Sequence, residues 1–290
     1  MRLPKLNDER RRIHAQVSKN YSTTSLLNNV NYAIDSAAKD PTELHREHLA
    51  SFDQFHLNGL NATRLLANLS SVSSSMLVLD VGCGVGGAGR ALVEECGASV
   101  VGVDMSLNYV RSASVINAAK GLSSDFHLCV GDALSLPIGS RKVDLVWAQH
   151  IGMNIQDKRH MFREFSRVLR TDGTLSIYEI YSGRLPLTHY PVPWARDSDA
   201  SFLMPQNEIR EMIAAQGFSE VAWRDVTDQA LAGLRAVLSL PKQPSPLGLG
   251  LHLLVDDVGR RVQNLHENLE EGRLTVALGI FTSLGRIPDS

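Results

Sequence analysis

Short apolar runs alternate with amphipathic stretches from residue 76 onward, a pattern typical of βαβ units around a parallel sheet. The apolar runs predict strands at about 76–81, 98–104, 125–130, 143–149 and 173–181. The amphipathic stretches predict helices at about 87–96, 106–120 and 157–170. The last helix is the best marked, because Asp157 can cap its first turn and the sequence Thr171-Asp172-Gly173 is expected to end it.

The alternation stops after the fifth predicted strand. Residues 182–205 carry four prolines, which remove backbone donors and favour a long extended loop, and loops of this length are often functional. A helix at about 206–216 and a strand at about 218–224 follow. Residues 227–271 predict an inserted pair of helices interrupted by PKQPSPLGLG, and residues 273–284 predict a last strand.

The beginning of the chain has a different pattern. Residues 7–70 are polar with helical character, and they contain no β-branched run that would favour a strand. We therefore expect a helical N-terminal layer that packs on the α/β core, not an independent domain.

Composition and charge exclude some classes of partner. The chain has 290 residues, of which 43% are hydrophobic and 21% are charged, enough for one large α/β domain or two small ones. The formal net charge is -2, and the basic residues are scattered apart from Arg10, Arg11 and Arg12. We therefore expect neither nucleic acids nor acidic membrane surfaces as partners.

The cysteines and the N-terminus bear on location. Cys83, Cys96 and Cys129 cannot all pair, and they lie in segments expected to be interior, which favours a reducing compartment. The N-terminus lacks the apolar stretch of a secretory signal, and no window is long enough to span a bilayer. We therefore expect a cytoplasmic location.

A glycine-rich sequence, LDVGCGVGGAGR, contains the first predicted strand end. Gly82, Gly84 and Gly87 match the G-x-G-x-x-G pattern of dinucleotide-binding enzymes. Such glycines let the backbone approach a ligand closely at a helix N-terminus. Asp80 changes this interpretation, because a carboxylate beside the loop would repel a pyrophosphate and would favour a ligand that carries a cation. A dehydrogenase remains the weaker alternative.

Two further acids follow the next two predicted strands. Asp104 can accept hydrogen bonds from both hydroxyls of a ribose, although a cap for the following helix is a simpler alternative. Asp132, in the sequence GDALSLPI, lies within reach of an adenine amino group, and the backbone N–H of Ala133 lies beside it. Acids at three consecutive strand ends suit S-adenosylmethionine, which combines a ribosyl-adenine, a sulfonium and an ammonium group.

The chain resembles the class I S-adenosylmethionine-dependent methyltransferases. The resemblance depends on five segments: LDVGCGVGG (79–87), VVGVDMS (100–106), VGDALSLPI (130–138), VDLVWAQH (143–150) and EFSRVLRTDGTLSIYE (164–179). It implies an α/β fold with a Rossmann-like sheet of seven strands, mostly parallel, with the last strand antiparallel. The motifs imply cofactor contacts at Asp80, Gly82, Gly84, Gly87, Asp104, Met105, Asp132, Ala133 and Gln149.

The resemblance also implies three regions of one domain. Residues 1–70 would form a helical lid or layer, residues 71–182 the cofactor-binding core, and residues 183–290 a substrate-side loop, the last strands and the helical insertion. Tyr21 is a candidate lid contact because of its position in the first region.

A narrower resemblance lies outside the core. The segments DQFHLNGLNATRLLANL (53–69), WAQHIGMNIQDK (147–158), HYPVPWARDSDASFLMP (189–205) and ENLEEGRLTVALGIF (267–281) are similar to the sarcosine/dimethylglycine N-methyltransferase group and its relatives. This implies a small-molecule acceptor, in the first place the amine of an amino-acid-like substrate. O- or C-methylation of a secondary metabolite, or a non-catalytic cofactor-binding protein, are the alternatives. We expect no metal, and a monomer or a homodimer.

Candidate catalytic residues follow the fourth predicted strand. Methyl transfer from a sulfonium chiefly requires alignment of the nucleophile, and a hydroxyl acceptor usually needs a base as well. His150 is the best candidate base, although it equally fits a packing or orienting role. Gln149 beside it offers a neutral donor and acceptor, and His56 is a second candidate.

Candidate substrate contacts lie partly in the proline-rich loop. Tyr190 and Trp194 could surround a developing cation with aromatic faces, although Trp194 could equally pack against the helical insertion. Arg196 could pair with a substrate carboxylate, although a solvated surface charge is the simpler alternative. Met153 and His56 complete the predicted substrate contacts.

Overall fold

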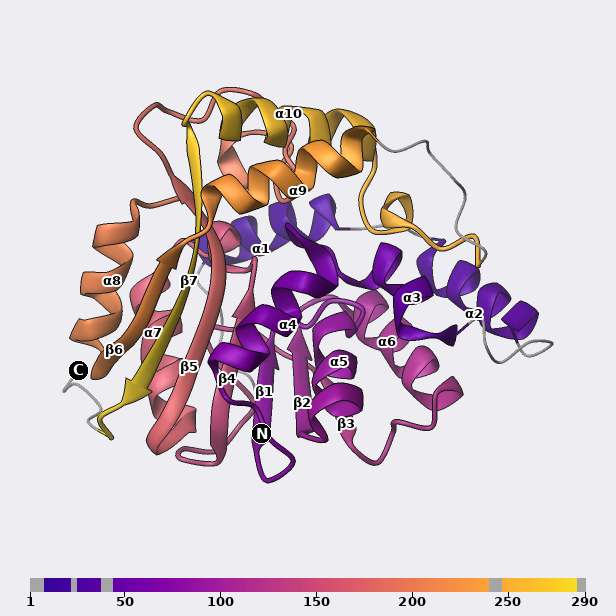
Figure 1. Ribbon diagram of the computed structural model, residues 1–290, viewed down its shortest axis with the longest axis horizontal. Helices are drawn as coiled ribbons and strands as arrows, with labels where there is room; N and C mark the ends of the chain where they lie inside the picture. Colours follow the sequence, from indigo (N-terminus) through magenta and orange to yellow (C-terminus); the bar gives the residue numbers. More distant parts are fainter. Residues whose placement is uncertain (1–7, 22–24, 38–43, 240–246, 286–290) are drawn as a thin grey trace.

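Seven strands form the centre of the computed structural model, which describes residues 8–21, 25–37, 44–239 and 247–285 (Figure 1). Their order in the sheet is β3-β2-β1-β4-β5-β7-β6. The strands are β1 (Leu77–Val81), β2 (Ser99–Asp104), β3 (Phe126–Val130), β4 (Val143–Gln149), β5 (Leu169–Ser182), β6 (Phe218–Asp225) and β7 (Leu274–Ser283). Strands β1 to β5 are parallel, and β7 is antiparallel to its neighbours β5 and β6. The predicted sheet of mostly parallel strands with an antiparallel last strand is confirmed.

Helices pack around this sheet. They are α1 (Asp8–Asn20), α2 (Leu26–Ala37), α3 (Arg46–Asp53), α4 (Gly59–Leu69), α5 (Gly87–Cys96), α6 (Leu107–Ala119), α7 (Lys158–Val168), α8 (Gln206–Ala215), α9 (Thr227–Ser239) and α10 (Val258–Glu270). Short 3-10 turns are η2 (Gly152–Asn154), η3 (Ser198–Ala200) and η4 (Leu251–Leu253). Helices α1, α9 and α10 lie past the carboxyl ends of the parallel strands, in the upper part of Figure 1.

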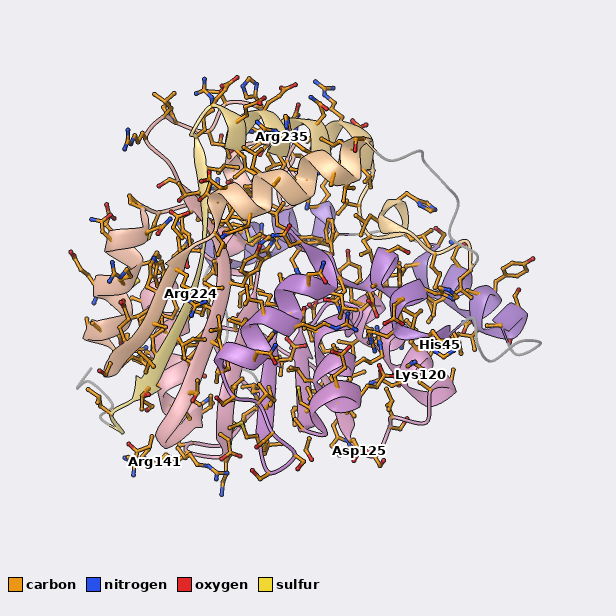
Figure 2. All side chains as sticks on the ribbon, viewed as in Figure 1. His45, Lys120, Asp125, Arg141, Arg224 and Arg235 are labelled. Carbon is orange, nitrogen blue, oxygen red and sulfur yellow. The ribbon has the colours of Figure 1, made fainter. Side chains whose placement is uncertain are left out.

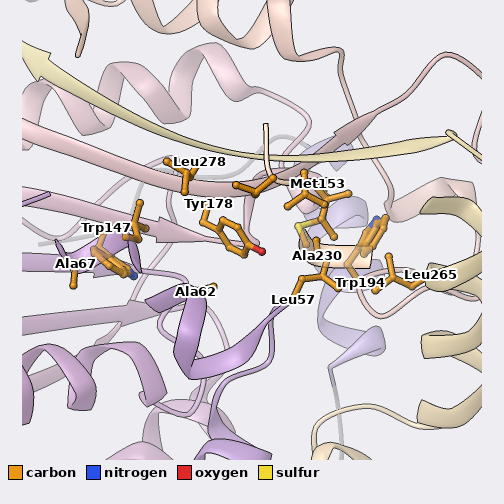
Figure 3. Packing of buried hydrophobic residues seen from close by; sticks show 14 of the residues in the cluster. Leu57, Ala62, Ala67, Trp147, Met153, Tyr178, Trp194, Ala230, Leu265 and Leu278 are labelled. Atoms are coloured by element: carbon orange, nitrogen blue, oxygen red, sulfur yellow. The ribbon is translucent and has the colours of Figure 1, made fainter. Parts of the chain in front are cut away.

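The two faces of the sheet have separate cores, because successive residues of a strand point to opposite faces. Val78 and Leu145 belong to a cluster that includes residues of α4, α5 and α10. Leu79 and Val146, their direct neighbours in sequence, belong to a second cluster with α7 and α8. Figure 3 shows part of the first cluster, which continues from Trp147 in the sheet toward α10. A third cluster joins α2 to α6.

The predicted elements agree with most of the structure. Strands β1 to β4 begin within one residue of their predicted starts, and the helical pair inserted before the last strand is present as α9 and α10. Four helices, α1 to α4, form the expected N-terminal layer within the described residues. Part of the sequence PKQPSPLGLG lies outside the described residues.

One boundary prediction was wrong. The helix expected to continue to residue 170 ends at Val168, because Leu169 already pairs with Val143 of β4. The sequence Thr171-Asp172-Gly173 does not end the helix, since it lies within the long strand β5 at an irregularity of the ladder. Asp172 has a left-handed φ of 62°, which accommodates the extra residues before regular pairing resumes.

The arginines labelled in Figure 2 lie apart from one another. Arg141, Arg224 and Arg235 lie at widely separated heights of the molecule (Figure 2). No helix among the described residues is long and apolar enough to cross a membrane. Cys83 is buried, Cys96 and Cys129 are half-buried, and all three are free thiols.

Candidate functional site

A cavity of about 1090 Å³ opens at the carboxyl ends of the parallel strands. Its walls come from α1, the segment between α3 and α4, the loops after β1 to β4, and the helices α9 and α10. Parallel sheets place their ligand crevice at this edge. The volume exceeds roughly 300–1,000 Å³, the usual range for one small-molecule site, so it has room for two ligands.

The glycine loop after β1 forms one wall. Gly82 and Gly84 have left-handed φ angles of 72° and 55°, which side chains rarely adopt. A Cβ on Gly84 would meet no heavy atom within 4 Å, so the bare backbone faces open space. A Cβ on Gly82 would lie 2.2 Å from Cγ2 of Ile151, so this glycine lets the loop after β4 approach β1.

Asp80 is a buried acid at the centre of this wall. Its side chain is 3% exposed, and its Oδ2 has no hydrogen-bond partner within the described structure. Burial raises the pKa of Asp80 to about 7, assisted by the charge of Asp104 and opposed by a hydrogen bond from the Gly89 backbone. A buried carboxylate with an unused oxygen is stabilised by a bound cation.

Asp104 ends β2 with both carboxylate oxygens held by the backbone. Its Oδ2 accepts from the Gly84 N–H at 2.9 Å, and its Oδ1 accepts from the Ser106 N–H at 2.8 Å. Each oxygen retains a further acceptor position toward the cavity. Burial raises the pKa of Asp104. Ser106, and not Asp104, caps α6 by accepting from the Tyr109 N–H, so the capping alternative for Asp104 was wrong.

The loop after β3 completes the strand-end acids. Asp132 and Ala133 both line the cavity, as does Met105 after β2. Asp132 Oδ1 accepts from the Leu134 N–H at 2.8 Å, which fixes the turn. The structure therefore brings together the acids predicted at three strand ends.

Two histidines and a tyrosine meet at the opposite wall. The rings of His150 and Tyr178 are stacked, with centroids 5.2 Å apart and planes 10° apart. The ring of His56 meets His150 edge to face at 5.9 Å. Burial, with a contribution from the neighbouring His56, lowers the pKa of His150 well below its usual value. Burial lowers the pKa of His56 to about 4. Both rings are therefore neutral at pH 7, a state that can accept a proton.

A polar network holds the histidines. His56 Nε2 lies 2.9 Å from Gln54 Oε1 and 3.2 Å from the Thr63 hydroxyl. Gln149 Oε1 accepts from the Trp147 indole N–H at 2.9 Å and from Thr63 at 3.3 Å. The Nε2 atoms of Gln149 and of His150 have no partner among the described residues. A ligand in the cavity can satisfy these groups.

Glu179, which the sequence analysis did not select, fixes the loop that carries His150. His150 has a left-handed φ of 51°, an unusual conformation for a residue with a side chain. Glu179 Oε1 accepts from the Ile151 and Gly152 N–H groups, each at 3.0 Å. Burial raises the pKa of Glu179 to about 7, opposed by these hydrogen bonds and by the Lys158 ammonium. The acid inside the apolar run TLSIYEIY was the available sequence signal.

Helix α1 covers the cavity, as the lid hypothesis for Tyr21 requires. Val17 and Tyr21 line the cavity. The Tyr21 hydroxyl donates to Asn154 Oδ1 at 2.8 Å, and the Asn154 amide donates to the backbone oxygens of Trp194 and Ala200. The end of α1 is thereby connected to η2 and to the proline-rich loop.

Among the predicted substrate contacts, His56, Met153 and Trp194 line the cavity. Trp194 is also buried in the cluster shared with α10, and its indole N–H donates to the Ser201 hydroxyl at 2.9 Å. Trp194 therefore lines the cavity and packs against the insertion at the same time.

Three predicted site residues lie elsewhere. Gly87 is absent from the cavity lining within the described structure, and a Cβ there would lie 2.0 Å from the backbone oxygen of Asp53. Gly87 therefore allows α3 to pack on α5. Tyr190 also lies outside that lining and packs against the buried cluster of the first sheet face. Arg196 pairs with Asp256 at 2.8 Å instead of facing the cavity.

Comparison with known proteins agrees with this geometry. Residues 78–173, from β1 into β5, match a family described as "Methyltransferase domain". This part of the chain is a class I S-adenosylmethionine-dependent methyltransferase domain. Its cofactor core is the part that the family shares.

Curated relatives match mainly over this core of the methyltransferase. The chain is 34% identical to methyltransferase GfsG of Streptomyces halstedii over 131 residues, 45% of this chain and 47% of that protein. It is 29% identical to phosphoethanolamine N-methyltransferase 3 of Arabidopsis thaliana over 181 residues, 62% of this chain and 36% of that protein. These matches span less than half the length of the relatives.

Solved structures share the fold over most of the chain. A geranyl diphosphate C-methyltransferase from Streptomyces coelicolor A3(2) covers 97% of this chain and all of its own, with a TM-score of 0.67 and 15% identity. A putative sarcosine dimethylglycine methyltransferase from Galdieria sulphuraria covers 79% of this chain and 87% of its own, with a TM-score of 0.60 and 20% identity. At these identities the likeness establishes the fold alone.

The residues present fit the cofactor of this family. The unpartnered Oδ2 of Asp80 provides a buried negative charge, and Gly84 leaves room for a ligand against the backbone. The described residues contain no cluster of three or more His, Cys, Asp or Glu side chains placed to hold a metal ion.

Proposed function

We propose that this chain transfers a methyl group from S-adenosylmethionine to a hydroxyl group of a small molecule. The observation that carries this proposal is one cavity that contains both the strand-end acids and a pair of neutral, buried histidines. The acids suit the nucleoside and cationic parts of the cofactor, and the histidines suit the removal of a proton.

The cofactor would occupy the wall formed by β1 to β3. Asp104 would accept hydrogen bonds from the ribose hydroxyls, since each of its oxygens retains an acceptor position. Asp132 and the Ala133 N–H would contact the adenine, and Asp80 would face the positive charge. The bound cofactor supplies the methyl group of its sulfonium. The remainder of the cofactor is released as the neutral thioether S-adenosylhomocysteine.

His150 would accept the acceptor's proton. As the acceptor oxygen forms its bond to the methyl carbon and the carbon–sulfur bond breaks, the hydroxyl proton passes to the neutral imidazole, which later returns it to solvent. Burial keeps this ring unprotonated at pH 7 but also makes it a weak base, so the proton would move to it as the new bond to the methyl carbon makes the hydroxyl strongly acidic. Tyr178, stacked on the ring, and Glu179, which holds the following backbone, fix its position.

An amine of an amino-acid-like acceptor is the second candidate. A neutral amine needs no base, so the relatives with N-methyltransferase names support this candidate. Recognition of its carboxylate was expected from Arg196, which is instead paired with Asp256. The hydroxyl acceptor is therefore favoured.

The test combines calorimetry with an acceptor screen. Titration with S-adenosylmethionine should show binding, and release of S-adenosylhomocysteine should depend on a hydroxylated acceptor. His150→Gln should lower kcat by about 10²- to 10⁴-fold with cofactor affinity unchanged, while His127→Gln, at an exposed site on β3, should have no effect. A mild effect of His150→Gln together with activity on sarcosine would favour the amine.

Two other results would overturn the proposal. Cofactor binding without turnover of any acceptor would identify a non-catalytic binding protein. Thermal stabilisation by NADH and not by S-adenosylmethionine would restore the dehydrogenase interpretation.

A further inference from the structure

The structure assigns to the part of the cavity beyond the cofactor wall of β1 to β3 an acceptor that is uncharged and mainly apolar, with its hydroxyl at His56 and His150. The body of this molecule would lie in a chamber formed by residues of α1, the segment between α3 and α4, η2, β5, the proline-rich loop, α9 and α10. This inference rests on the proposed function and specifies the acceptor class of the same site.

The chamber walls are apolar and come from separated parts of the chain. Seven side chains line the cavity and also belong to one buried hydrophobic cluster: Val17, Leu57, Met153, Ile180, Trp194, Leu234 and Leu265. Figure 3 shows Leu57, Met153, Trp194 and Leu265 converging on the same region. An apolar molecule that fills this space gains about 25 cal/mol for each Å² of surface removed from water.

The charges of the cavity disfavour an anionic acceptor. Its described lining contains neither lysine nor arginine. The acids that line it are Asp53, Asp80, Asp104, Asp132 and Asp157. A carboxylate or phosphate would therefore leave water without gaining a cationic partner, at a cost of several kcal/mol.

The buried arginines of the described structure are already paired. Arg90 and Arg46 bind the same oxygen of Asp53, at 2.8 and 3.2 Å. Arg261, which is buried beneath the proline-rich loop, binds Asp256 at 2.7 Å and the backbone oxygen of Val192 at 2.6 Å. Recruiting either group to an acceptor would break an existing buried contact.

The polar contacts needed by a single hydroxyl are present where the chamber meets the histidines. The Gln149 amide nitrogen lacks a partner in the described segments and can donate to an acceptor oxygen. His150 can accept the hydroxyl proton at the same place, since its ring lines the same cavity. One polar anchor beside an apolar chamber is the usual arrangement for recognition of a hydrophobic small molecule.

The first experiment compares three probes of one shape on the protein saturated with S-adenosylhomocysteine. Isothermal titration calorimetry would measure 2-naphthol, 2-naphthoate and 2-naphthyl phosphate. We expect 2-naphthol to bind at least about tenfold more tightly than either anion. Equal or tighter binding of the anions would overturn the inference.

Two chamber variants then locate the site. Leu234→Ala should weaken 2-naphthol binding by roughly tenfold, and Val262→Lys, a half-buried lining residue of α10, should raise affinity for 2-naphthoate. Val221→Ala, at a site 64% exposed on β6, is the matched control. Affinity for S-adenosylhomocysteine reports whether each variant is folded. Unchanged probe binding in both folded chamber variants would overturn the inference.

Failure of this inference is distinguishable from failure of the proposed function. Methylation of sarcosine with weak 2-naphthol binding would refute the apolar acceptor and leave methyl transfer intact. Absence of S-adenosylmethionine binding would refute the proposed function, whatever the naphthol result.

Discussion

Replacement of Glu179 should separate two effects that the structure assigns to one buried acid. In Glu179→Ala, the Ile151 and Gly152 N–H groups lose their shared acceptor, which now lies 3.0 Å from each. Each buried donor left without a partner costs about 1–3 kcal/mol, so at pH 5, where the acid in the folded protein is still protonated, the free energy of unfolding should fall by about 2–6 kcal/mol. The loop that holds His150 should loosen at the same time.

Glu179→Gln should behave differently, because its amide oxygen still accepts these hydrogen bonds. The pKa of Glu179 is raised from 4.5 to about 7 in the folded protein. Between these values the folded state keeps the proton and the unfolded chain loses it, so the free energy of unfolding falls as pH rises. Above pH 7 the accumulated cost is about 3 kcal/mol. Glutamine does not ionise, so the variant should gain stability relative to the native protein from pH 5 to pH 8.

The assay is urea denaturation followed by circular dichroism at pH 5 and pH 8. His56, whose folded pKa is lowered to about 4, gives stability that rises with pH through the same window, but this contribution is common to both proteins and cancels in their difference. Tyr181→Phe is the control, since that buried hydroxyl has no partner in the described structure. An alanine variant as stable as the native protein at pH 5, or a glutamine variant whose advantage does not grow with pH, would refute the reasoning.

Three further predictions concern the cofactor wall and the lid. Cofactor binding favours the ionised form of Asp80, whose pKa is about 7. Calorimetry should therefore show S-adenosylmethionine binding about tenfold more weakly at pH 6 than at pH 8. The same dependence of affinity on pH in Asp80→Asn would exclude this acid as the cause. The methyl group of Gly87→Ala would lie 2.0 Å from the Asp53 backbone oxygen, so the free energy of unfolding measured by chemical denaturation should fall by about 1–3 kcal/mol or more. Gly84→Ala should mainly lose cofactor affinity. Equal losses of stability in the two variants would contradict this distinction. Tyr21→Phe removes the 2.8 Å hydrogen bond to Asn154 of η2. The loss of about 1 kcal/mol should speed the dissociation of S-adenosylhomocysteine about fivefold, as measured by stopped-flow fluorescence. An unchanged rate would argue against a lid.

The cofactor half of the site could be predicted from sequence because its residues occur at regular positions. Asp80, Asp104 and Asp132 each follow an apolar run, and parallel strands bring their carboxyl ends to one edge. The alternation of apolar runs and amphipathic stretches determined the strands in the same way. Local patterns therefore sufficed where each element contributes one residue at its end.

The acceptor half could not be predicted so well, because it depends on contacts between distant segments. Arg196 lies in the expected loop, but its guanidinium is drawn to Asp256 of the segment before α10. Glu179 acts on a loop about thirty residues earlier, through pairing of β5 with β4. Gly87 matched the spacing of a motif, but a side chain at this position would collide with the end of α3. No motif in the sequence indicated that α3 would pack there.

The attachment of the α9–α10 insertion has a consequence for how new specificities can arise. At its start, the Val226 N–H donates to the Val276 oxygen at 2.8 Å, and the Val276 N–H donates to the Thr227 hydroxyl at 2.9 Å. The insertion is thus anchored to β7 by one backbone hydrogen bond and by the Thr227 side chain, while none of the acids at the ends of β1 to β3 belongs to it. Because this contiguous stretch lines the cavity without contributing any of those acids, we expect substitutions at its cavity-lining positions to change the choice of acceptor before they change cofactor binding.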